Sequence, residues 1–228
     1  MKTEFDAYAR RYEETVRRSI GFSGQEVDFF TRAKARALVE VAEEELGELS
    51  RLDALDVGCG IGLTDRLLAD AFGSLSGLDV SEAAIEVAAE ENPRVRYAAY
   101  DGETFPFADA AFNVVFAICV LHHVPPPLRP SLVAEMARVA RPGGIVVVFE
   151  HNPYNPLTRL VVRRCEFDED AVLLPRRETK RLLAGSKLTL AYERYILFFP
   201  RDGAVVRRCE RAFRRVPLGA QYLVAGRR

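Results

Sequence analysis

The most constraining feature of this sequence is an alternation, from residue 52 to residue 149, of short apolar segments with segments of helical spacing. We expect strands at residues 52–57, 75–78, 95–99, 112–119 and 145–149. Between them, apolar residues recur every three or four positions, which is typical of amphipathic helices. Short apolar strands joined by helices form a parallel sheet covered on both faces. Such sheets bind ligands at the carboxyl ends of their strands.

The segments on either side of this alternation follow other patterns. Residues 1–50 predict two helices, at about 5–20 and 26–46, which we assign to an N-terminal helical lid. The last third predicts a loop at 151–156, a helix at 176–184, a strand at 188–199, a basic helical segment at 204–216 and a final strand at 221–225. This order suits a non-parallel strand at the sheet edge. We expect one α/β domain over 51–228, with a substrate-side insertion at about 156–216.

Composition limits the cellular setting of the chain. Its 228 residues contain no apolar run near the roughly 20 residues needed to span a bilayer. The first residues lack a signal-like apolar stretch, and the four cysteines show no C-x-x-C spacing, so we expect a cytoplasmic protein. Residues 1–150 hold 15 Lys and Arg against 25 Asp and Glu, whereas 151–228 hold 17 against 8. The acidic part disfavours nucleic acid, and the basic part suits an anionic partner.

A glycine-rich turn follows the first expected strand, in the sequence Leu55-Asp56-Val57-Gly58-Cys59-Gly60-Ile61-Gly62. Glycines at alternate positions let the backbone approach a ligand closely, and the next helix directs free N–H groups at that ligand. The nicotinamide and flavin fingerprint G-x-G-x-x-G does not fit, because its third glycine would fall on Leu63 or Asp65. The pattern present is G-x-G-x-G preceded by an acid.

Four segments occur together in a characteristic order: LDVGCGIG (55–62), GLDVS (77–81), FNVVFAICVLHHV (112–124) and RPGGIVVVFEHNP (141–153). Their combination resembles the class I S-adenosylmethionine (SAM)-dependent methyltransferases, in particular the small-molecule group that includes the ubiquinone and menaquinone methyltransferases. The resemblance covers roughly residues 50–155. It implies a Rossmann-like seven-stranded sheet with helices on both faces and strand seven antiparallel, SAM as cofactor and S-adenosylhomocysteine as product. It says little about the acceptor.

The resemblance also implies roles for individual residues. Asp79 matches the acid that accepts hydrogen bonds from the two ribose hydroxyls. Asp56 would act on the methionine amino group, through the turn or a water. Helix-start charge for Asp79, strand-end support for Asp56 and a turn role for Asp101 stay open as alternatives. The expected cofactor-binding residues are Tyr8, Tyr12, Asp56, Gly58, Cys59, Gly60, Gly62, Asp79, Val80, Asp101, Gly102, Ile118 and Cys119.

The three histidines, His122, His123 and His151, follow the fourth and fifth expected strands and so lie at the ligand edge. Methyl transfer needs alignment of acceptor and methyl group, and some acceptors need a base, a role that suits His near neutral pH. We therefore name all three as candidate catalytic bases. The alternative is that they bond the loop or line the pocket. We predict no metal, because no Asp or Glu accompanies them at the end of strand four.

The function predicted is transfer of a methyl group from SAM to a small organic acceptor, through O, N or C, with an amphipathic or anionic acceptor favoured. The alternatives are a SAM-binding protein without methyl transfer, such as a regulator or cyclase, and a tRNA-modifying methyltransferase. DNA is not expected, and RNA only weakly. The basic segment Arg207–Arg215 is either a solvated face or a contact for a phosphate-bearing or membrane-surface partner. Arg32 and Lys34 are either solvated or in reach of the SAM carboxylate.

Overall fold

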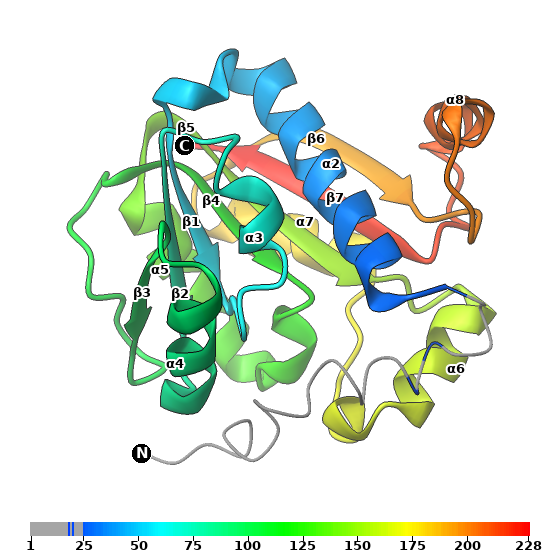
Figure 1. Cartoon of the computed structure of the whole chain (residues 1–228), viewed down its shortest axis with the longest axis horizontal. Coiled ribbons are helices and arrows are strands. Elements are labelled where there is room, and N and C mark those ends of the chain that lie inside the picture. Colours follow the sequence, from blue (N-terminus) through cyan, green and yellow to red (C-terminus); the bar gives the residue numbers. More distant parts are fainter. Residues whose placement is uncertain (1–17, 19, 21–24) are drawn as a thin grey trace.

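The structure is a computed structural model that describes residues 18, 20 and 25–228. Tyr8 and Tyr12 lie outside these described residues. The fold is a seven-stranded sheet in the order β3-β2-β1-β4-β5-β7-β6, with helices on both faces (Figure 1). Strand β7 runs antiparallel to both of its neighbours, β5 and β6, and the pairings from β3 to β5 are parallel. The predicted α/β architecture and the antiparallel seventh strand are therefore confirmed.

The strands follow the apolar segments of the sequence closely. They are β1 (Asp53–Val57), β2 (Ser74–Asp79), β3 (Arg96–Ala99), β4 (Phe112–Ile118), β5 (Ala140–His151), β6 (Thr189–Ile196) and β7 (Gln221–Arg227). The α-helices in the described part of the chain are α2 (Val27–Leu46), α3 (Asp65–Leu68), α4 (Glu82–Glu91), α5 (Arg129–Val139), α6 (Pro156–Arg164), α7 (Arg176–Gly185) and α8 (Ala204–Phe213). Short 3-10 turns are η4 (Leu49–Arg51), η5 (Leu121–His123), η6 (Pro126–Leu128) and η7 (Glu166–Asp168).

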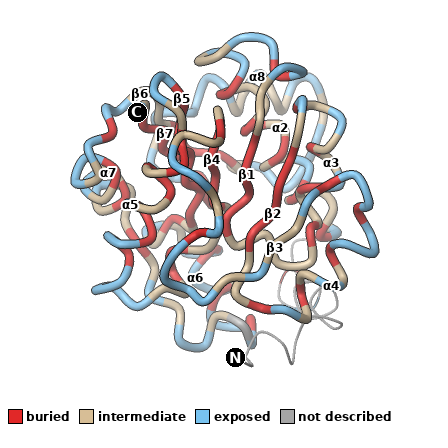
Figure 2. Tube along the Cα trace, turned by 90° about the vertical axis from the view of Figure 1, so that its left-hand side faces the viewer, coloured by how far each residue is buried: buried red, intermediate tan, exposed pale blue. Residues whose placement is uncertain are grey.

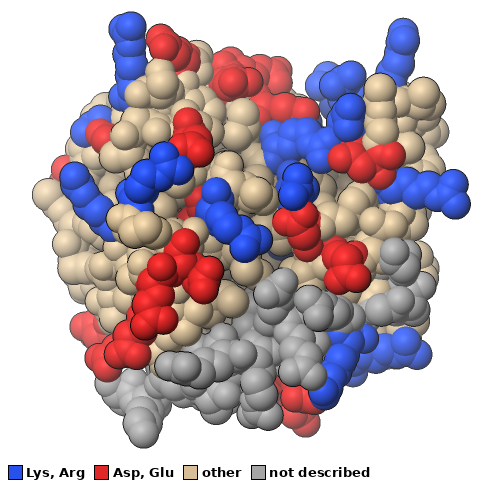
Figure 3. Space-filling model, viewed as in Figure 1, with Lys and Arg blue, Asp and Glu red and all other residues tan. Residues whose placement is uncertain are grey.

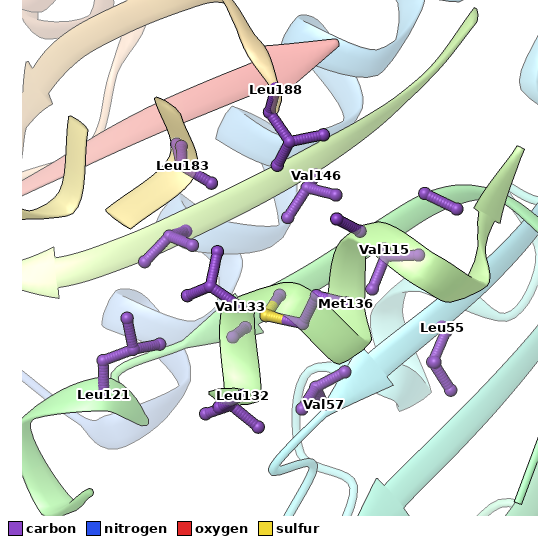
Figure 4. Close-up of a cluster of buried hydrophobic side chains, with 14 of the residues drawn as sticks. Leu55, Val57, Val115, Leu121, Leu132, Val133, Met136, Val146, Leu183 and Leu188 are labelled. Atoms are coloured by element: carbon purple, nitrogen blue, oxygen red, sulfur yellow. The ribbon is translucent and has the colours of Figure 1, made fainter. Parts of the chain in front are cut away.

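Two hydrophobic cores lie on opposite faces of the sheet. Along β4, Val115 and Ala117 face one core, whereas Val114 and Phe116 face the other, as the period of a strand requires. Helices α5 and α7 cover the first core, which Figure 4 shows in close-up. Helices α2 and α3 cover the second. Figure 2 shows the central strands buried and the exposed residues on the surrounding helices and loops.

Three elements differ from the sequence prediction. The helix expected over 63–72 is regular only at Asp65–Leu68 and continues as turns. The long strand expected to reach residue 199 ends at Ile196, because Leu197 has a φ of 60° and the next backbone N–H groups bond to Glu210. Helix α6 occupies a segment for which no helix was predicted.

The expected insertion at 156–216 is not one continuous segment. Helix α7 packs on β7 and β6 forms the sheet edge, so residues 176–196 belong to the sandwich itself. The segments outside it are 156–175, which contains α6 and η7, and 197–216, which contains α8. None of the helices described here is both long and apolar enough to span a membrane.

Candidate functional site

The glycine turn leaves β1 in a conformation that only glycine adopts readily. Gly58, Gly60 and Gly62 have φ values of 74°, 54° and 74°. A Cβ atom on Gly62 would lie 2.5 Å from the side-chain nitrogen of Asn92, so this glycine permits close packing. Among the residues that the structure describes, nothing lies within 4 Å of the position that a Cβ atom on Gly60 would take. These residues therefore leave room at the Gly60 backbone, as a turn that receives a ligand requires.

Asp79 links this turn to the neighbouring strand. At the end of β2, its Oδ2 accepts the Gly60 N–H at 2.8 Å and its Oδ1 accepts the Ser81 N–H at 2.9 Å. A carboxylate offers about four acceptor positions, so two backbone bonds orient the group for further donors. Ser81 caps α4, because its hydroxyl accepts the Ala84 N–H at 3.1 Å.

Two carboxyl groups are buried together behind the turn. Asp56 and Asp65 each have an oxygen without a hydrogen-bond partner among the described residues, whereas the other oxygen of Asp65 accepts the Tyr97 hydroxyl at 2.9 Å. Burial, followed by the charge of Asp65, raises the pKa of Asp56 well above its usual range. Burial also raises the pKa of Asp65 to about 6. The pair can therefore share a proton, and a cationic amino group nearby would favour its ionised form.

Val80 and the turn at Asp101 lie side by side at the end of β2 and β3. A Cβ atom on Gly102 would lie 3.7 Å from the Val80 side chain. Asp101 is exposed, and its Oδ1 accepts the Glu103 and Thr104 N–H groups at 2.9 and 3.1 Å. The turn role that the sequence left open for Asp101 is thus present, whatever else this residue does.

Cys119 follows Ile118 at the end of β4 and has a φ of 60°, which is uncommon for a residue other than glycine. Burial raises the pKa of its thiol to about 12, so the group is protonated and unreactive at neutral pH. The Gln221 side-chain nitrogen from β7 lies 3.3 Å from its sulfur. Cys119 therefore presents a neutral, polarisable side chain at the end of β4.

The positive charge of Lys34, on α2, acts on three groups at this edge of the sheet. Its ammonium acts to lower the pKa of Asp56, of Cys119 and of His151. Arg32 instead forms an exposed ion pair with Asp28 on its own helix. Of the two cations that the sequence singled out, Lys34 is the one near the candidate site.

The three histidines gather at the ends of β4 and β5, as predicted. The ring of His122 lies 4.1 Å from that of His123 and 5.0 Å from that of His151, measured between centroids. Two carboxylates that the sequence analysis did not single out join them. Glu150 is fully buried and its Oε2 lies 2.6 Å from His122 Nδ1. Asp168 Oδ1 lies 3.4 Å from Nε2 of both His122 and His123.

These neighbours give the histidines different protonation states. Burial opposes charge on His122, but Glu150 and Asp168 outweigh it and raise its pKa to about 9. Burial and the His122 charge lower the pKa of His123 to about 4, and the same two causes lower that of His151 to about 4. At neutral pH His122 is therefore an imidazolium, with protons on both ring nitrogens. His123 and His151 are neutral, so each keeps one ring nitrogen that can accept a proton.

Comparison with known proteins agrees with this geometry. Residues 55–148, which contain the glycine turn, Asp79 and the first two histidines, match the family described as a methyltransferase domain. This matched region is a methyltransferase domain of the class I SAM-dependent type. Its cofactor is SAM, and three features of the described residues fit that group: the backbone at Gly60, the oriented carboxylate of Asp79 and the Asp56 oxygen that has no hydrogen-bond partner among them.

The curated relatives match this chain over only part of their own length. A demethylmenaquinone methyltransferase of Renibacterium salmoninarum is 30% identical over 154 residues, which cover 67% of this chain and 60% of the relative. Across three curated relatives the matched part covers between 31% and 60% of the relative.

Two solved structures share the fold at low sequence identity. One is the putative methyltransferase from Haloferax volcanii in complex with the Trm112 activator, with a TM-score of 0.67, 21% identity and coverage of 100% of this chain and 98% of that one. The other is geranyl diphosphate C-methyltransferase from Streptomyces coelicolor, in complex with Mg²⁺, geranyl diphosphate and S-adenosylhomocysteine. Its TM-score is 0.60 at 20% identity, over 85% of this chain and 78% of that one.

The sequence analysis did not single out three residues of this site: Glu150, Asp168 and Gln221. It named Lys34 but left open whether this lysine is solvated. Glu150 was visible as the acid before His151, inside the quoted segment 141–153. Gln221 and Asp168 carried no local signal, because only the tertiary fold brings β7 and η7 to the ends of β4 and β5.

Proposed function

We propose that this protein transfers a methyl group from SAM to a small organic acceptor bound at the carboxyl edge of the sheet. The observation that carries the proposal is the junction of the glycine turn with Asp79, where the Gly60 N–H and the Ser81 N–H orient the carboxylate at the end of β2. In the proposal Asp79 receives the ribose hydroxyls, Asp56 faces the methionine amino group and Lys34 faces the carboxylate. Val80, Asp101 and Gly102 border the adenine.

When bound, SAM supplies an electrophilic methyl group. The part assigned to this chain is alignment, exclusion of water and, for an acidic acceptor, removal of a proton. We assign proton removal to His151, because it is neutral and is linked through Gln221 to the end of β4. The Gln221 Nε2 atom lies 3.3 Å from His151 Nδ1 and 3.3 Å from Cys119 Sγ. His122 is less suited, because it already carries a proton at neutral pH.

The Gln221 amide supports this assignment. Its oxygen has no hydrogen-bond partner among the described residues, while its nitrogen faces His151 Nδ1. Oxygen and nitrogen of an amide side chain exchange places by a half-turn. After that turn the oxygen would accept the His151 Nδ1–H and the Cys119 thiol, and His151 Nε2 would keep the lone pair that a base needs.

We further propose an amphipathic acceptor with an anionic group. The charge pattern supports this: Lys and Arg side chains gather toward α8 on the face shown in Figure 3. Arg208 and Arg211 on α8 are exposed, as are Arg214 and Arg215 just after it, while Arg207 pairs with Asp202 at 2.7 Å. The geranyl diphosphate methyltransferase acts on an acceptor of that chemical type, an apolar chain with a diphosphate. The cytoplasm stays the proposed location.

The test is methyl transfer from SAM labelled in its methyl group, with a small-molecule extract and an RNA fraction of cells as separate acceptors. Label in the small-molecule fraction, dependent on the protein, is the expected result. Label in RNA that ribonuclease removes would instead favour the tRNA-modifying alternative. SAM binding with no labelled product in either fraction would favour a SAM-binding protein without methyl transfer, as the regulator or cyclase alternative requires.

A further inference from the structure

Two of the histidines, together with Asp168, have the layout of a metal-binding site. His122 and His123 are consecutive in η5, and Asp168 comes from η7, more than 40 residues later. One ligand atom of each residue lies within 4.8 Å of the others. Both Nε2 atoms lie 3.4 Å from the same Asp168 oxygen. With metal–ligand bonds of about 2.0–2.1 Å, two ligands of a tetrahedral zinc ion are ~3.3 Å apart, close to these separations.

Glu150 orients one of the imidazoles for this role. Its carboxylate is fully buried and bonds His122 Nδ1 at 2.6 Å, which leaves Nε2 as the ring atom that faces Asp168. Metal-bound histidines commonly donate their second ring nitrogen to such a carboxylate. With both imidazoles neutral, as metal binding requires, Glu150 and Asp168 would carry two negative charges, and a divalent cation would balance them. The side chain of Asp168 is only 9% exposed, so its charge is poorly screened by solvent.

A route from solvent reaches the Asp168 side of the cluster. A groove of about 520 Å³ runs beside α6 and η7, and Asp168 is part of its lining, with Arg159, Val162, Cys165 and Leu173 among its neighbours. Such a groove can admit an ion and supply a water molecule as fourth ligand, the arrangement seen in open zinc sites.

We propose that His122, His123 and Asp168 bind a divalent transition-metal ion, best matched by Zn²⁺, with Glu150 as positioning carboxylate and water as fourth ligand. Two imidazoles and one carboxylate favour zinc and its neighbours over Mg²⁺ and Ca²⁺, which prefer oxygen ligands only. The ion would fasten η7, within the segment 156–175, to the turn after β4. The sequence offered no carboxylate beside His122 and His123 at the end of strand four, and the fold provides Asp168 from a distant turn. The proposal does not depend on methyl transfer.

The test uses the full chain without an affinity tag, freed of metal with a chelator and kept in reductant. Titration with Zn²⁺ by calorimetry and with Co²⁺ by visible absorption is expected to show one equivalent bound, with the visible bands of four- or five-coordinate cobalt. Asp168→Asn and His123→Ala should each weaken binding by at least about tenfold. Glu150→Gln should weaken it by about 10–100-fold, as loss of an outer carboxylate does. Circular dichroism checks that each variant is folded.

His151→Ala is the matched control, because it removes a histidine of the same cluster that lies outside the ligand set. It should bind Zn²⁺ and Co²⁺ as the unchanged protein does. No stoichiometric binding, binding that Asp168→Asn and His123→Ala leave unaltered, or a cobalt spectrum dominated by thiolate charge transfer would each overturn the proposal. His122 would then be an imidazolium held between two carboxylates.

Discussion

Single residues at the glycine turn couple cofactor binding to pH. Burial raises the pKa of Asp65 to about 6 and that of its neighbour Asp56 above its usual range, so this pair binds protons that the unfolded chain would release. The amino group of SAM favours the ionised pair, so binding should release up to one proton. We expect SAM affinity to increase from pH 5.5 to pH 7, as the folded pKa is passed.

Calorimetry in two buffers of different ionisation enthalpy measures this released proton. Asp56→Asn should bind SAM more weakly at pH 7 and should release no proton. Equal affinity at the two pH values, together with identical heats in the two buffers, would contradict a protonated pair in the free protein.

His151 is the residue whose replacement we expect to lower kcat. His151→Ala should lower kcat by about 10²–10⁴ on a substrate that needs a base and leave SAM affinity near that of the unchanged protein. Because its pKa is lowered to about 4, the neutral form persists down to that pH, and kcat at saturating SAM should stay flat from pH 8 to about 5.5. Undiminished turnover in the variant would leave alignment alone, or another base.

The sequence indicated most residues of the cofactor half of the site and only some of the acceptor half. Gly60 and Asp79 could be named as candidates because the motif that marks them depends on spacing along one strand, turn and helix. Asp168 and Gln221 could not be found, since their position depends on how segments far apart in the sequence pack. Protonation states were equally out of reach, because they follow from burial and from those distant carboxylates.

Among the elements, one buried arginine joins the turn after β4 to α7 and the segment that precedes α7; together these form the cover over the strand ends. Arg129 is 1% exposed, and its guanidinium bonds the carbonyls of Leu121, Val124 and Val172 at 2.7–3.0 Å and the Glu178 carboxylate at 2.9 Å. Arg129→Leu should lower the free energy of unfolding by about 3–5 kcal/mol, because it leaves buried acceptors unpaired.

Urea unfolding at pH 7 measures this loss of stability. Arg94→Leu is the control, since Arg94 forms an exposed ion pair with Asp70 and its loss should leave the midpoint of unfolding near that of the unchanged protein. A similar small change in both variants would show that Arg129 does not hold the cover in place.

Helix α8 tests the proposed anionic acceptor. It has no buried residue, and Glu210 anchors it to the end of β6, so changes on its outer face should not disturb the sheet. Arg208→Glu with Arg211→Glu should raise KM for the acceptor, leave SAM affinity unchanged, and lose its effect as salt rises from about 0.05 to 0.5 M.

Arg177→Glu with Arg181→Glu is the matched control, because it makes the same charge change on the exposed side of α7. It should leave KM unaltered. If the α8 variant also has the KM of the unchanged protein at low salt, the arginines form a solvated face and the anionic acceptor is excluded.

Element boundaries were predictable where a local signal sets them. Strands β1 to β4 match their apolar runs, and Ser81 begins α4 as its capping pattern indicates. Helix α6 was missed although Asn155 caps it and Pro156 occupies its first turn, a start signal that is legible in the sequence. The early end of β6 was not predictable, because Glu210 satisfies the backbone there from another helix.

For the whole molecule, the sequence predicted seven strands and an antiparallel seventh strand only through its resemblance to a family. The alternation of strands and helices indicates a parallel sheet, but nothing local specifies that β7 inserts between β5 and β6. The two cores follow from strand periodicity, so layer composition was predictable even though strand order was not. The account of function depends on a SAM-binding edge at the carboxyl ends of β1, β2 and β4.

The most direct measurement of that central claim is calorimetric titration of S-adenosylhomocysteine into the unchanged protein, Asp79→Asn and Asp53→Asn. Asp53 is a matched control, because it begins β1 at the opposite edge of the sheet, where it pairs with Arg141. We predict that Asp79→Asn weakens binding by about 1.5–3 kcal/mol, the loss of charge-assisted hydrogen bonds, and that Asp53→Asn binds as the unchanged protein does. Unchanged affinity in folded Asp79→Asn, or no binding by the unchanged protein, would contradict the account.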